Sequence, residues 1–332
     1  MKRKVIIDTD PGIDDALAII FALQHPEIEV LGFTSVGGNK GLQSTTDNVT
    51  RILNYFNSDI KVYKGSDKNY SKIVDDEFEM ELDNSKENIH GADGLGAAVL
   101  EKNDALISDI DATTFILDTL KKYPNEVDII TLGPLTNLAF CMDEDMETLK
   151  QAKSIHSMGG GVHRGNRTPV AEFNYWYDPH SVNKVFELGG DLPIYMVGLD
   201  ITHQAVLDMN DLTFMKLIDP KLGKLINQML DSYIENYWEN QRILGAVMHD
   251  LTAIVGYMYP ELYTEVLHAN MKCVTDNIPA IGQTVVDTED DMSSAKNSYI
   301  PMKLDVQMYK ENVIKSIFGQ AALDEYIQHI EQ

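Results

Sequence analysis

Short apolar runs and longer mixed segments alternate along the N-terminal part of this chain. The short runs are typical of buried strands, whereas the longer segments have the length and composition of helices. The expected strands are residues 5–8, 30–36, 60–63, 127–131, 154–158 and 194–197. The expected helices run from Asp14 onward and over residues 44–56, 113–123, 134–140 and 179–188.

Strands that alternate with helices of this size predict βαβ units, a mostly parallel sheet and therefore an α/β fold. Because crossovers between parallel strands are right-handed, the C-terminal ends of the strands should meet at one edge of the sheet. Ligands bind at that edge in open α/β sheets. We therefore expect the functional residues to follow directly after the strands.

The C-terminal part of the chain has a different pattern. Residues 221–256 are more helical and rich in aromatic side chains. The pattern predicts β-like runs at 271–275, 283–286 and 303–308, and then a closing helix from Asn312.

No internal repeat and no low-complexity linker divides the sequence, so we expect one domain over residues 1–332 with a helical lobe around 221–256. Residues 75–87 are strongly acidic and lack a helical period. Such a composition favours a solvated segment, and we expect a mobile acidic loop around 68–90.

Composition narrows the class of protein. The chain has 332 residues, of which 44% are hydrophobic and 24% charged, as in ordinary globular proteins. The formal net charge of −25 argues against nucleic acid and anionic membrane surfaces as partners. Cys141 and Cys273 are too few for a disulfide framework, and no apolar run suits a signal sequence or a membrane span. We therefore expect a cytoplasmic protein.

Four aspartates, Asp8, Asp10, Asp14 and Asp15, lie within eight positions beside a Pro-Gly turn. A helix N-terminus stabilises a carboxylate by roughly 0.3–1 kcal/mol, which can account for one of the four but not for all. A hard divalent cation such as Ca²⁺ collects carboxylate and carbonyl oxygens and offsets their repulsion. The sequence therefore predicts a metal site after the first strand.

An EF-hand does not explain the cluster. A calcium loop that begins at Asp8 would have Ile13 at its glycine position and Ile19 at its bidentate glutamate. A loop that begins at Asp10 would end on Phe21. Both registers therefore fail.

A phosphatase of the haloacid dehalogenase type is a second alternative, because such enzymes also begin with an apolar strand and Asp-x-Asp. A Thr or Val usually stands two residues after the second aspartate, where this chain has Gly12. The pair Asp14-Asp15 also has no role in that scheme. The phosphatase therefore stays as the weaker alternative.

Polar groups that could complete a metal-hydroxide hydrolase follow other strands and precede a later helix. Each has an ordinary explanation when taken alone, because Asn forms turns and Asp caps helices. Taken together they supply oxygen ligands and an imidazole. They are Asn39, the carbonyl of Leu132, Asn166, Glu172, Asn174 and the pair His249-Asp250.

These segments closely resemble those of the nucleoside hydrolases, the inosine-uridine preferring nucleoside N-ribohydrolases. The element D-x-D-P-G-x-D-D is highly specific, and the segments follow the family's order. They are DTDPGIDDA (8–16), GGN (37–39), HGADGLG (90–96), GPLTN (133–137), MGGG (158–161), AEFN (171–174), DP (178–179) and HD (249–250).

The resemblance implies a Rossmann-like α/β fold with a central mixed, mainly parallel sheet flanked by helices. It also implies one bound Ca²⁺ and hydrolysis of the N-glycosidic bond of ribonucleosides to ribose and free base, as in nucleoside salvage. The substrate would be a small-molecule nucleoside, and the assembly a homodimer or homotetramer. The base pocket comes from the least shared segments, so the preference for purine or pyrimidine stays open.

The resemblance also assigns roles to individual positions. Asp10, Asp15, Asp250 and the carbonyl of Leu132 would ligate Ca²⁺, and Asp10 would also be the general base. The ribose would be bound by Asp14, Asn39, Asn174 and Met158, with Asn166 and Glu172 at its 5′-hydroxyl. His249 and His90 would lie near the leaving base, and Tyr233, Tyr237, Trp238 and Arg242 would either border the base or belong to the core.

These roles agree with the chemistry of the reaction. Breaking the bond builds positive charge on the ribose, and surrounding carboxylates stabilise that charge more than they stabilise the neutral substrate. A bound cation lowers the pKa of water, whose proton Asp10 could then remove, and the imidazole of His249 could protonate the departing base. The other alternative is a non-catalytic Ca²⁺-dependent nucleoside- or ribose-binding protein, which would require neither side chain.

Overall fold

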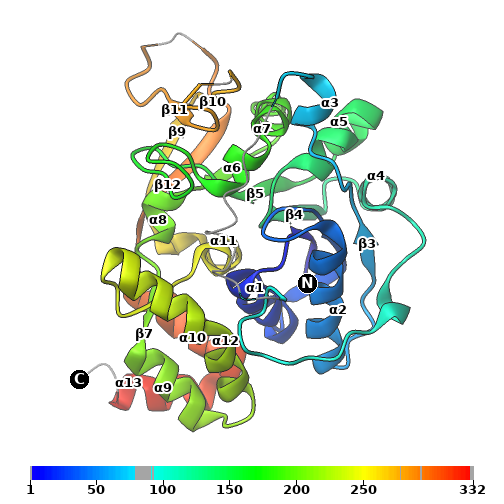
Figure 1. Ribbon diagram of the computed structural model, residues 1–332. Coiled ribbons are helices and arrows are strands. Elements are labelled where there is room, and N and C mark those ends of the chain that lie inside the picture. The colour runs from blue at the N-terminus through cyan, green and yellow to red at the C-terminus, as the bar shows by residue number, and fades with distance from the viewer. Residues whose placement is uncertain (1, 79–90, 92, 277, 292–293, 330–332) are drawn as a thin grey trace.

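The computed structural model describes residues 2–78, 91, 93–276, 278–291 and 294–329. Its central sheet has eight strands in the order β3-β2-β1-β4-β5-β6-β12-β9 (Figure 1). Neighbouring strands are parallel except for the edge pair of β12 and β9, so the expected mixed, mainly parallel sheet is confirmed. The strands are β1 (Arg3–Thr9), β2 (Ile28–Ser35), β3 (Val62–Lys64), β4 (Val127–Thr131), β5 (Ser154–Met158), β6 (Ile194–Val197), β9 (Tyr263–Ala269) and β12 (Ser298–Leu304).

Helices follow most strands and cover both faces of this sheet. Because strand side chains alternate between faces, Val5 and Ile7 of β1 enter one apolar cluster and Ile6 enters the other. The first cluster includes α1, α11 and α12, and the second includes α4, α5 and α7. The helices are α1 (Ile13–Gln24), α2 (Leu42–Tyr55), α3 (Ser71–Val74), α4 (Ala112–Lys122), α5 (Thr136–Leu149), α6 (Phe173–Tyr177), α7 (Pro179–Phe186), α8 (Leu199–Thr202), α9 (Met209–Ile218), α10 (Leu222–Gln241), α11 (His249–Met258), α12 (Val306–Phe318) and α13 (Gln320–His329).

Two antiparallel pairs lie outside the central sheet. One joins β7 (Val206–Asp208) to β8 (Gly245–Val247), and the other joins β10 (Met271–Cys273) to β11 (Thr284–Val286). In Figure 1 the β10–β11 pair lies at the top, beyond the edge strand β9, whereas α9, α10, α12 and α13 gather at the lower left. The region expected to be a helical lobe thus contains α10 and the start of α11, with β8 between them.

One C-terminal run was assigned to the wrong element. Residues 303–308 were expected to be β-like, with a helix from Asn312, but β12 ends at Leu304 and α12 begins at Val306. The cause is Asp305, whose side chain accepts a hydrogen bond from the backbone N–H of Met308 and caps the helix. This cap starts the helix inside the apolar run.

The described part of the expected acidic loop contains helix α3. The carboxylate of Asp178 accepts hydrogen bonds from the backbone N–H groups of Tyr70 and Ser71 and from the Ser71 hydroxyl. Thr136 at the start of α5 donates a further bond to the same carboxylate. Residues 79–90 of the loop lie outside the described residues.

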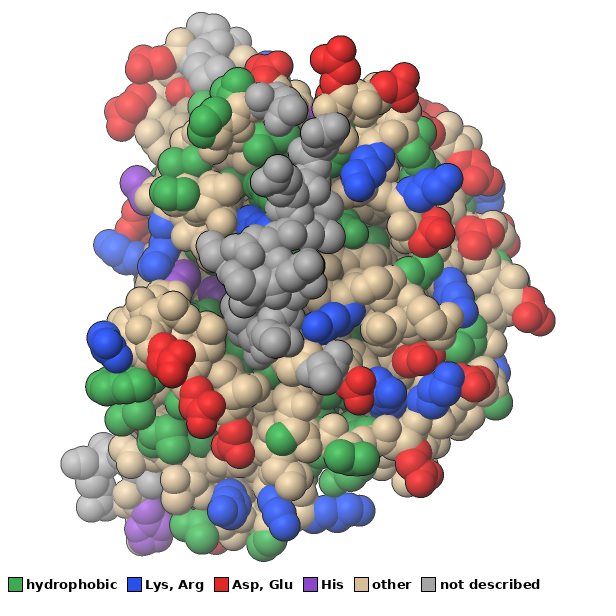
Figure 2. Space-filling view, in the orientation of Figure 1, with side chains coloured by type: hydrophobic (Ala, Val, Ile, Leu, Met, Phe, Trp, Pro, Cys, Tyr) green, Lys and Arg blue, Asp and Glu red, His purple; other side chains and the backbone are tan. Residues whose placement is uncertain are grey.

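The surface carries both signs of charge. On the face shown in Figure 2, Asp and Glu side chains are scattered among Lys and Arg side chains rather than gathered in one patch. Within the part of the chain that the structure describes, no helix combines the length and apolarity needed to cross a membrane.

Candidate active site

The central strand β1 positions the aspartate cluster. It pairs with β2 on one side and with β4 on the other, so the strand order diverges at its C-terminal end. Ligands in open α/β sheets bind at such a point of divergence. β1 ends at Thr9, and a short turn through Pro11 and Gly12 leads directly into α1. The cluster therefore occupies the position expected for a binding site.

Two helix N-termini bring three carboxylates together. Asp14 and Asp15 lie in the first turn of α1, and Asp250 lies in the first turn of α11, which packs against α1. One oxygen from each carboxylate lies within 4.8 Å of the other two. Unpaired backbone N–H groups at a helix N-terminus stabilise negative charge, which favours this arrangement. All three side chains are buried.

Burial and mutual repulsion disfavour the ionised forms of this cluster. Burial raises the pKa of Asp10 well above its usual value, and the neighbouring charges of Asp15 and Asp14 raise it further. The same causes raise the pKa of Asp14 to about 7. The pKa of Asp250 is also raised well above its usual value, by burial and then by Asp14 and Asp15. A divalent cation would remove this penalty, because opposite charge favours the ionised carboxylates.

The backbone at two glycines lies so close to the carboxylate of Asp10 that no larger residue would fit there. A Cβ atom at Gly38 would lie 2.1 Å from Asp10 Oδ2, and one at Gly133 would lie 2.6 Å from Oδ1. The N–H of Asn39 donates to Oδ2 at 2.7 Å, whereas the buried Oδ1 has no hydrogen-bond partner among the described residues. A buried carboxylate oxygen left without a partner is costly. Oδ1 therefore fits a ligand, and hard oxygen donors of this kind suit Ca²⁺.

Asp15 is held firmly in place. Thr9 donates its hydroxyl to Asp15 Oδ1 at 2.6 Å, and the N–H of Gly12 donates to Oδ2 at 2.9 Å. The side-chain amide of Asn39 lies 3.3 Å from Asp15 Oδ2 and 3.3 Å from the carbonyl oxygen of Asp10. Asn39, expected on the ribose, thus also ties the two aspartates together.

Asp8, the fourth member of the cluster, is part of the framework. Its Oδ1 accepts hydrogen bonds from the hydroxyl of Thr34 and from the side-chain amide of Asn137. Asn137 also donates to the carbonyl oxygen of Ser35 on β2. Asp8 therefore fixes the beginning of α5 to the strands at the centre of the sheet.

The expected sugar-binding residues meet at the end of β4. The Nδ2 group of Asn174 donates to the carbonyl oxygen of Leu132 at 2.7 Å. The same group lies 3.2 Å from the carbonyl oxygen of Met158 and 3.4 Å from its Sδ. All three residues are buried. The structure therefore brings the expected ligand carbonyl and two expected ribose residues into direct contact.

Glu172 and Asn166 shape the loop between β5 and α6. Glu172 caps α6 and accepts hydrogen bonds from the N–H groups of Asn174, Tyr175 and Gly160. Burial raises its pKa to about 7 in spite of these bonds. Asn166 is exposed, and its Oδ1 accepts a bond from the N–H of Phe173 at 2.9 Å.

A hydrogen-bonded chain leads from the carboxylates to His249. Tyr233 donates to Asp14 Oδ2 at 3.3 Å, and Tyr237 is hydrogen-bonded to Tyr233. The hydroxyl of Tyr237 lies 2.6 Å from Nε2 of His249, and Thr202 Oγ1 lies 2.7 Å from Nδ1. Both tyrosines are buried on one side of α10. Two tyrosine hydroxyls thus connect the imidazole of His249 to the carboxylate of Asp14.

Two other expected residues, Trp238 and Arg242, lie away from the carboxylates. Trp238 is 47% exposed, and the Arg242 guanidinium lies 5.5 Å from the centre of its ring. These two residues contact each other at the solvent-facing end of α10. His90 lies outside the described residues.

Sequence reasoning missed Thr202 and His203. His203 lies edge-on to His249 with ring centroids 5.2 Å apart, and burial lowers its pKa to about 4. Both residues follow β6 through the short helix α8. Their place just after a strand was a signal that could have identified them.

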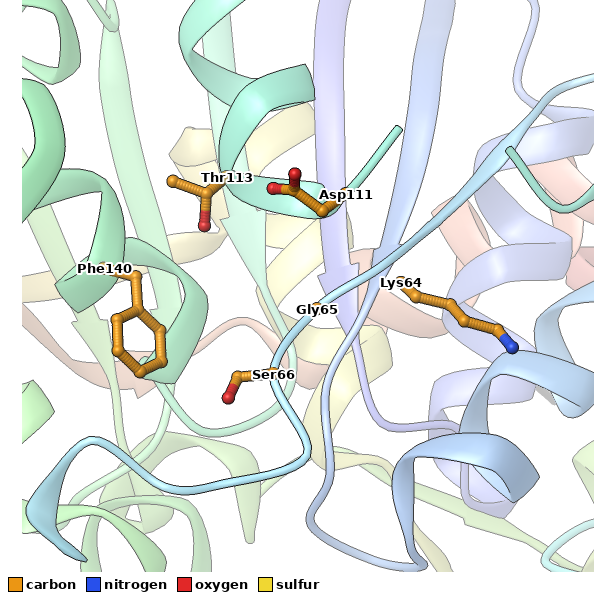
Figure 3. A pocket seen from close by; sticks show the side chains of 6 residues that line it. All are labelled: Lys64, Gly65, Ser66, Asp111, Thr113 and Phe140. Atoms are coloured by element: carbon orange, nitrogen blue, oxygen red, sulfur yellow. The ribbon is translucent and has the colours of Figure 1, made fainter. Parts of the chain in front are cut away.

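A surface hollow of about 260 Å³ lies beside the site rather than in it (Figure 3). It is lined by Lys64, Gly65, Ser66, Asp111, Thr113 and Phe140, none of which is an expected site residue. In Figure 3, Lys64 extends away from Phe140, and its Nζ donates to Gln43 at 3.0 Å. The side chains that could act in catalysis therefore converge at the aspartates and not in this hollow.

The chain matches one protein family over most of its length. The family model described as "Inosine-uridine preferring nucleoside hydrolase" covers residues 5–311. Two curated relatives are the pyrimidine-specific ribonucleoside hydrolases RihB of Escherichia coli O1:K1 and Escherichia fergusonii. Each is 31% identical over 311 residues, which cover 93% of this chain and 95% of the relative.

Solved structures show the same similarity in three dimensions. A plant nucleoside hydrolase, PpNRh1, matches with a TM-score of 0.86 and 29% identity over 96% of this chain and 100% of its own. A purine-preferring ribonucleoside hydrolase from Gardnerella vaginalis matches with a TM-score of 0.86 and 29% identity, over 96% of this chain and 99% of its own.

Proposed function

Since this chain belongs to the inosine-uridine preferring nucleoside hydrolase family, it hydrolyses the N-glycosidic bond of ribonucleosides, and we propose that Ca²⁺ bound among its buried carboxylates takes part. The family match confirms the enzyme class expected from the sequence, rather than the binding protein or the phosphatase. The observation that carries the calcium proposal is the convergence of Asp14, Asp15 and Asp250 beside the unpartnered Oδ1 of Asp10.

In this proposal, Asp10, Asp15, Asp250 and the carbonyl of Leu132 hold the ion. Carboxylate and carbonyl oxygens are the donors that Ca²⁺ prefers. Asp10 and Asp250 gain most from such binding, because burial and neighbouring carboxylates disfavour their ionised forms. When bound, the cation lowers the pKa of a water molecule in contact with it.

Asp10 is the general base. Asn39 fixes Oδ2 of this carboxylate, and the buried Oδ1 is left to accept a proton from the attacking water. A base must lie within hydrogen-bond reach of the proton that it removes, and a fixed carboxylate meets this condition without reorganising.

The ribose lies against Asp14, Asn39, Asn174 and Met158, with Asn166 and Glu172 at its 5′-hydroxyl. Hydrolysis of a glycosidic bond passes through an oxocarbenium-like transition state. Carboxylates fixed around the sugar stabilise this positive charge more than they stabilise the neutral substrate, and so they raise the rate.

His249 protonates the leaving base. Its two ring nitrogens contact Thr202 and Tyr237, and Tyr237 continues to Tyr233. An imidazole can donate a proton at neutral pH, and the hydroxyl groups of Tyr237 and Thr202 hold its two ring nitrogens in place. We place Tyr233 and Tyr237, buried beside His249, on the side of the leaving base.

The preference for a purine or a pyrimidine base can be determined with a panel of nucleosides. The RihB relatives are pyrimidine-specific, and the Gardnerella enzyme is purine-preferring, at nearly equal identity to this chain. Ribose release should therefore be measured with inosine, adenosine, guanosine, uridine and cytidine. The ranking of kcat/KM values identifies the preferred base.

The variant Asp10→Asn tests the assignment of the base. It keeps the size of the side chain but removes the proton acceptor, so we expect kcat to fall by about 10²–10⁴-fold on the best substrate. Asp118→Asn, on the exposed side of α4, is the matched control and should retain wild-type kcat. An Asp10→Asn enzyme with a wild-type rate would refute the assignment.

A further inference from the structure

The β10–β11 pair contacts the loop that carries Asn166 and Glu172. The pair is antiparallel and aligns Cys273 with Thr284. Directly before β11, Gln283 forms an isolated antiparallel bridge with Ala171, which precedes Glu172 in the chain. A pair of strands from the C-terminal part of the sequence thus lies against the loop between β5 and α6.

Thr284 binds both backbone polar groups of one residue in that loop, Gly161. Its hydroxyl oxygen accepts a hydrogen bond from the N–H of Gly161 at 3.0 Å. The same hydroxyl donates to the carbonyl oxygen of Gly161. Thr284 and Gly161 are both buried, so water does not replace these bonds if the hydroxyl is lost.

Gly160 transmits this constraint to Glu172. Its N–H donates to Glu172 Oε2 at 3.0 Å, and its backbone has a φ of +71°, which favours glycine. A Cβ atom at Gly160 would lie 3.0 Å from Cγ2 of Thr284 and 2.9 Å from the ring of Tyr175. The tight backbone at this position leaves little freedom between Thr284 and the Glu172 carboxylate.

The strand pair itself is fixed at its other side. Asn183 on α7 accepts a bond from the N–H of Cys273 at 2.8 Å and donates to its carbonyl oxygen at 2.8 Å. Gly282 approaches α6 so closely that a Cβ atom there would lie 2.4 Å from Cα of Trp176. Thr284 therefore presents its hydroxyl from a rigid support.

Asn166 lies in the same loop between β5 and α6 that contacts the β10–β11 pair. The carbonyl oxygen of Ala171 accepts bonds from the N–H groups of Asn166 and Arg167, each at 3.1 Å. The side chain of Asn166 in turn binds the N–H of Phe173. Because Ala171 pairs with Gln283, the loop that carries both expected 5′-hydroxyl ligands closes against β11.

We propose that Thr284 is a positioning residue of this hydrolase, which fixes the backbone on both sides of Gly161 so that Glu172 and Asn166 can receive the 5′-hydroxyl of the ribose. The inference rests on the proposed function, because it needs the ribose to be bound at that loop. Thr284 touches no reacting atom and acts through the loop. Residues that support ribose binding would then include one on β11, a strand that carries none of the family motifs.

The test compares Thr284→Val with Thr284→Ser on substrates with and without the 5′-hydroxyl. Valine keeps the shape but leaves both groups of Gly161 unpaired, so kcat/KM for uridine or inosine should fall by about tenfold. Serine keeps the hydroxyl and should restore most of the activity. With 5′-deoxyuridine or 5′-deoxyinosine, the valine variant should match the wild type. Thr213→Val, exposed on α9, is the matched control.

Three outcomes would overturn the inference: an equal loss on both substrates, no loss at all, or no rescue by serine. If the valine variant does not fold, Asn183→Ala replaces it, since it releases the strand pair from α7, and it should show the same dependence on the 5′-hydroxyl. A wild-type enzyme that cleaves no nucleoside would instead refute the proposed function, so the two failures are distinguishable.

Discussion

His156 is a buried histidine on β5 that has no expected role in catalysis. Its ring stacks on Tyr195 with centroids 4.5 Å apart, and its Nε2 lies 3.0 Å from the hydroxyl of Ser154. Burial lowers its pKa to about 4, and the nearby charges of Asp128 and Lys153 act in opposite directions. The imidazole is therefore neutral in the folded protein at pH 7.

This burial predicts a pH dependence of stability. Between the unfolded pKa of about 6.5 and the folded pKa, the unfolded chain binds more protons at His156 than the folded chain does. His156 therefore does not lower the free energy of unfolding above pH 6.5, but it lowers this free energy progressively as the pH decreases toward 4. Between pH 7 and pH 5, His156 should lower the free energy of unfolding by about 2 kcal/mol, and we expect His156→Gln to remove this part of the loss.

The measurement is the free energy of unfolding in urea at pH 7 and at pH 5, for the wild type and His156→Gln. Other groups titrate in the same range, so the difference between the two proteins is the quantity to compare. His268→Gln is the control, because His268 is exposed on β9. Equal pH dependence in wild type and His156→Gln would contradict the prediction.

Residues that lie outside the family motifs in the sequence were the hardest to predict. The sequence singled out Asp10 and Asp15 because four aspartates crowd around one turn, whereas Asp250 was assigned a role only by the resemblance of its segment to the family. Thr202 has only its place just after a strand as a signal, and Thr284 has none, since a threonine within a strand is an ordinary observation. Only the folded chain shows which backbone or ring each hydroxyl contacts.

At the scale of secondary structure, Asp178 joins three helices. It lies at the start of α7, and its carboxylate binds α3 through Tyr70 and Ser71 and binds α5 through Thr136. Asp178 is fully buried. Removing one acceptor from this carboxylate leaves buried donors without a partner, which is costly.

We therefore expect Asp178→Asn to lower the free energy of unfolding by about 1–3 kcal/mol, because the amide cannot accept at both former oxygens. Denaturant unfolding of the two proteins measures this loss. Asp118→Asn on α4 serves again as the exposed control. A variant as stable as the wild type would show that the bonds to α3 do not contribute to stability.

The elements that the sequence predicted best are three largely buried strands. The bounds of β4, β5 and β6 agree with the expected ones because each strand is buried and ends abruptly at polar or glycine residues. β9 was not predicted, since as an edge strand it exposes several side chains and lacks a clear apolar run. α9 was also missed, although Asp208 and Asp211 form a capping box at its start.

At the scale of the whole molecule, metal binding and folding should be coupled. The proposed ligands directly follow β1 and β4 or lie in the first turns of α1 and α11, so only the folded chain brings them together. A ligand that binds the folded state alone stabilises it by about 2.7 kcal/mol at a free concentration 100 times its dissociation constant. We expect Ca²⁺ to raise the melting temperature and a chelator to lower it.

Thermal unfolding with added Ca²⁺, with Mg²⁺ and with chelator measures this effect. Asp250→Asn should lose most of the response to Ca²⁺, whereas Asp118→Asn should keep it. A melting temperature that is unaffected by Ca²⁺ in the wild type would contradict the calcium proposal without bearing on the family.

The assembly of the site from distant segments also has a consequence in time. Asp250 is synthesised 235 residues after Asp15. At roughly 5–20 residues per second, a ribosome needs about 10–50 s to cover that distance. During this interval the first aspartates must stay hydrated, because their partner on α11 does not yet exist. If Ca²⁺ binds as proposed, the site can therefore be loaded only after α11 has been synthesised.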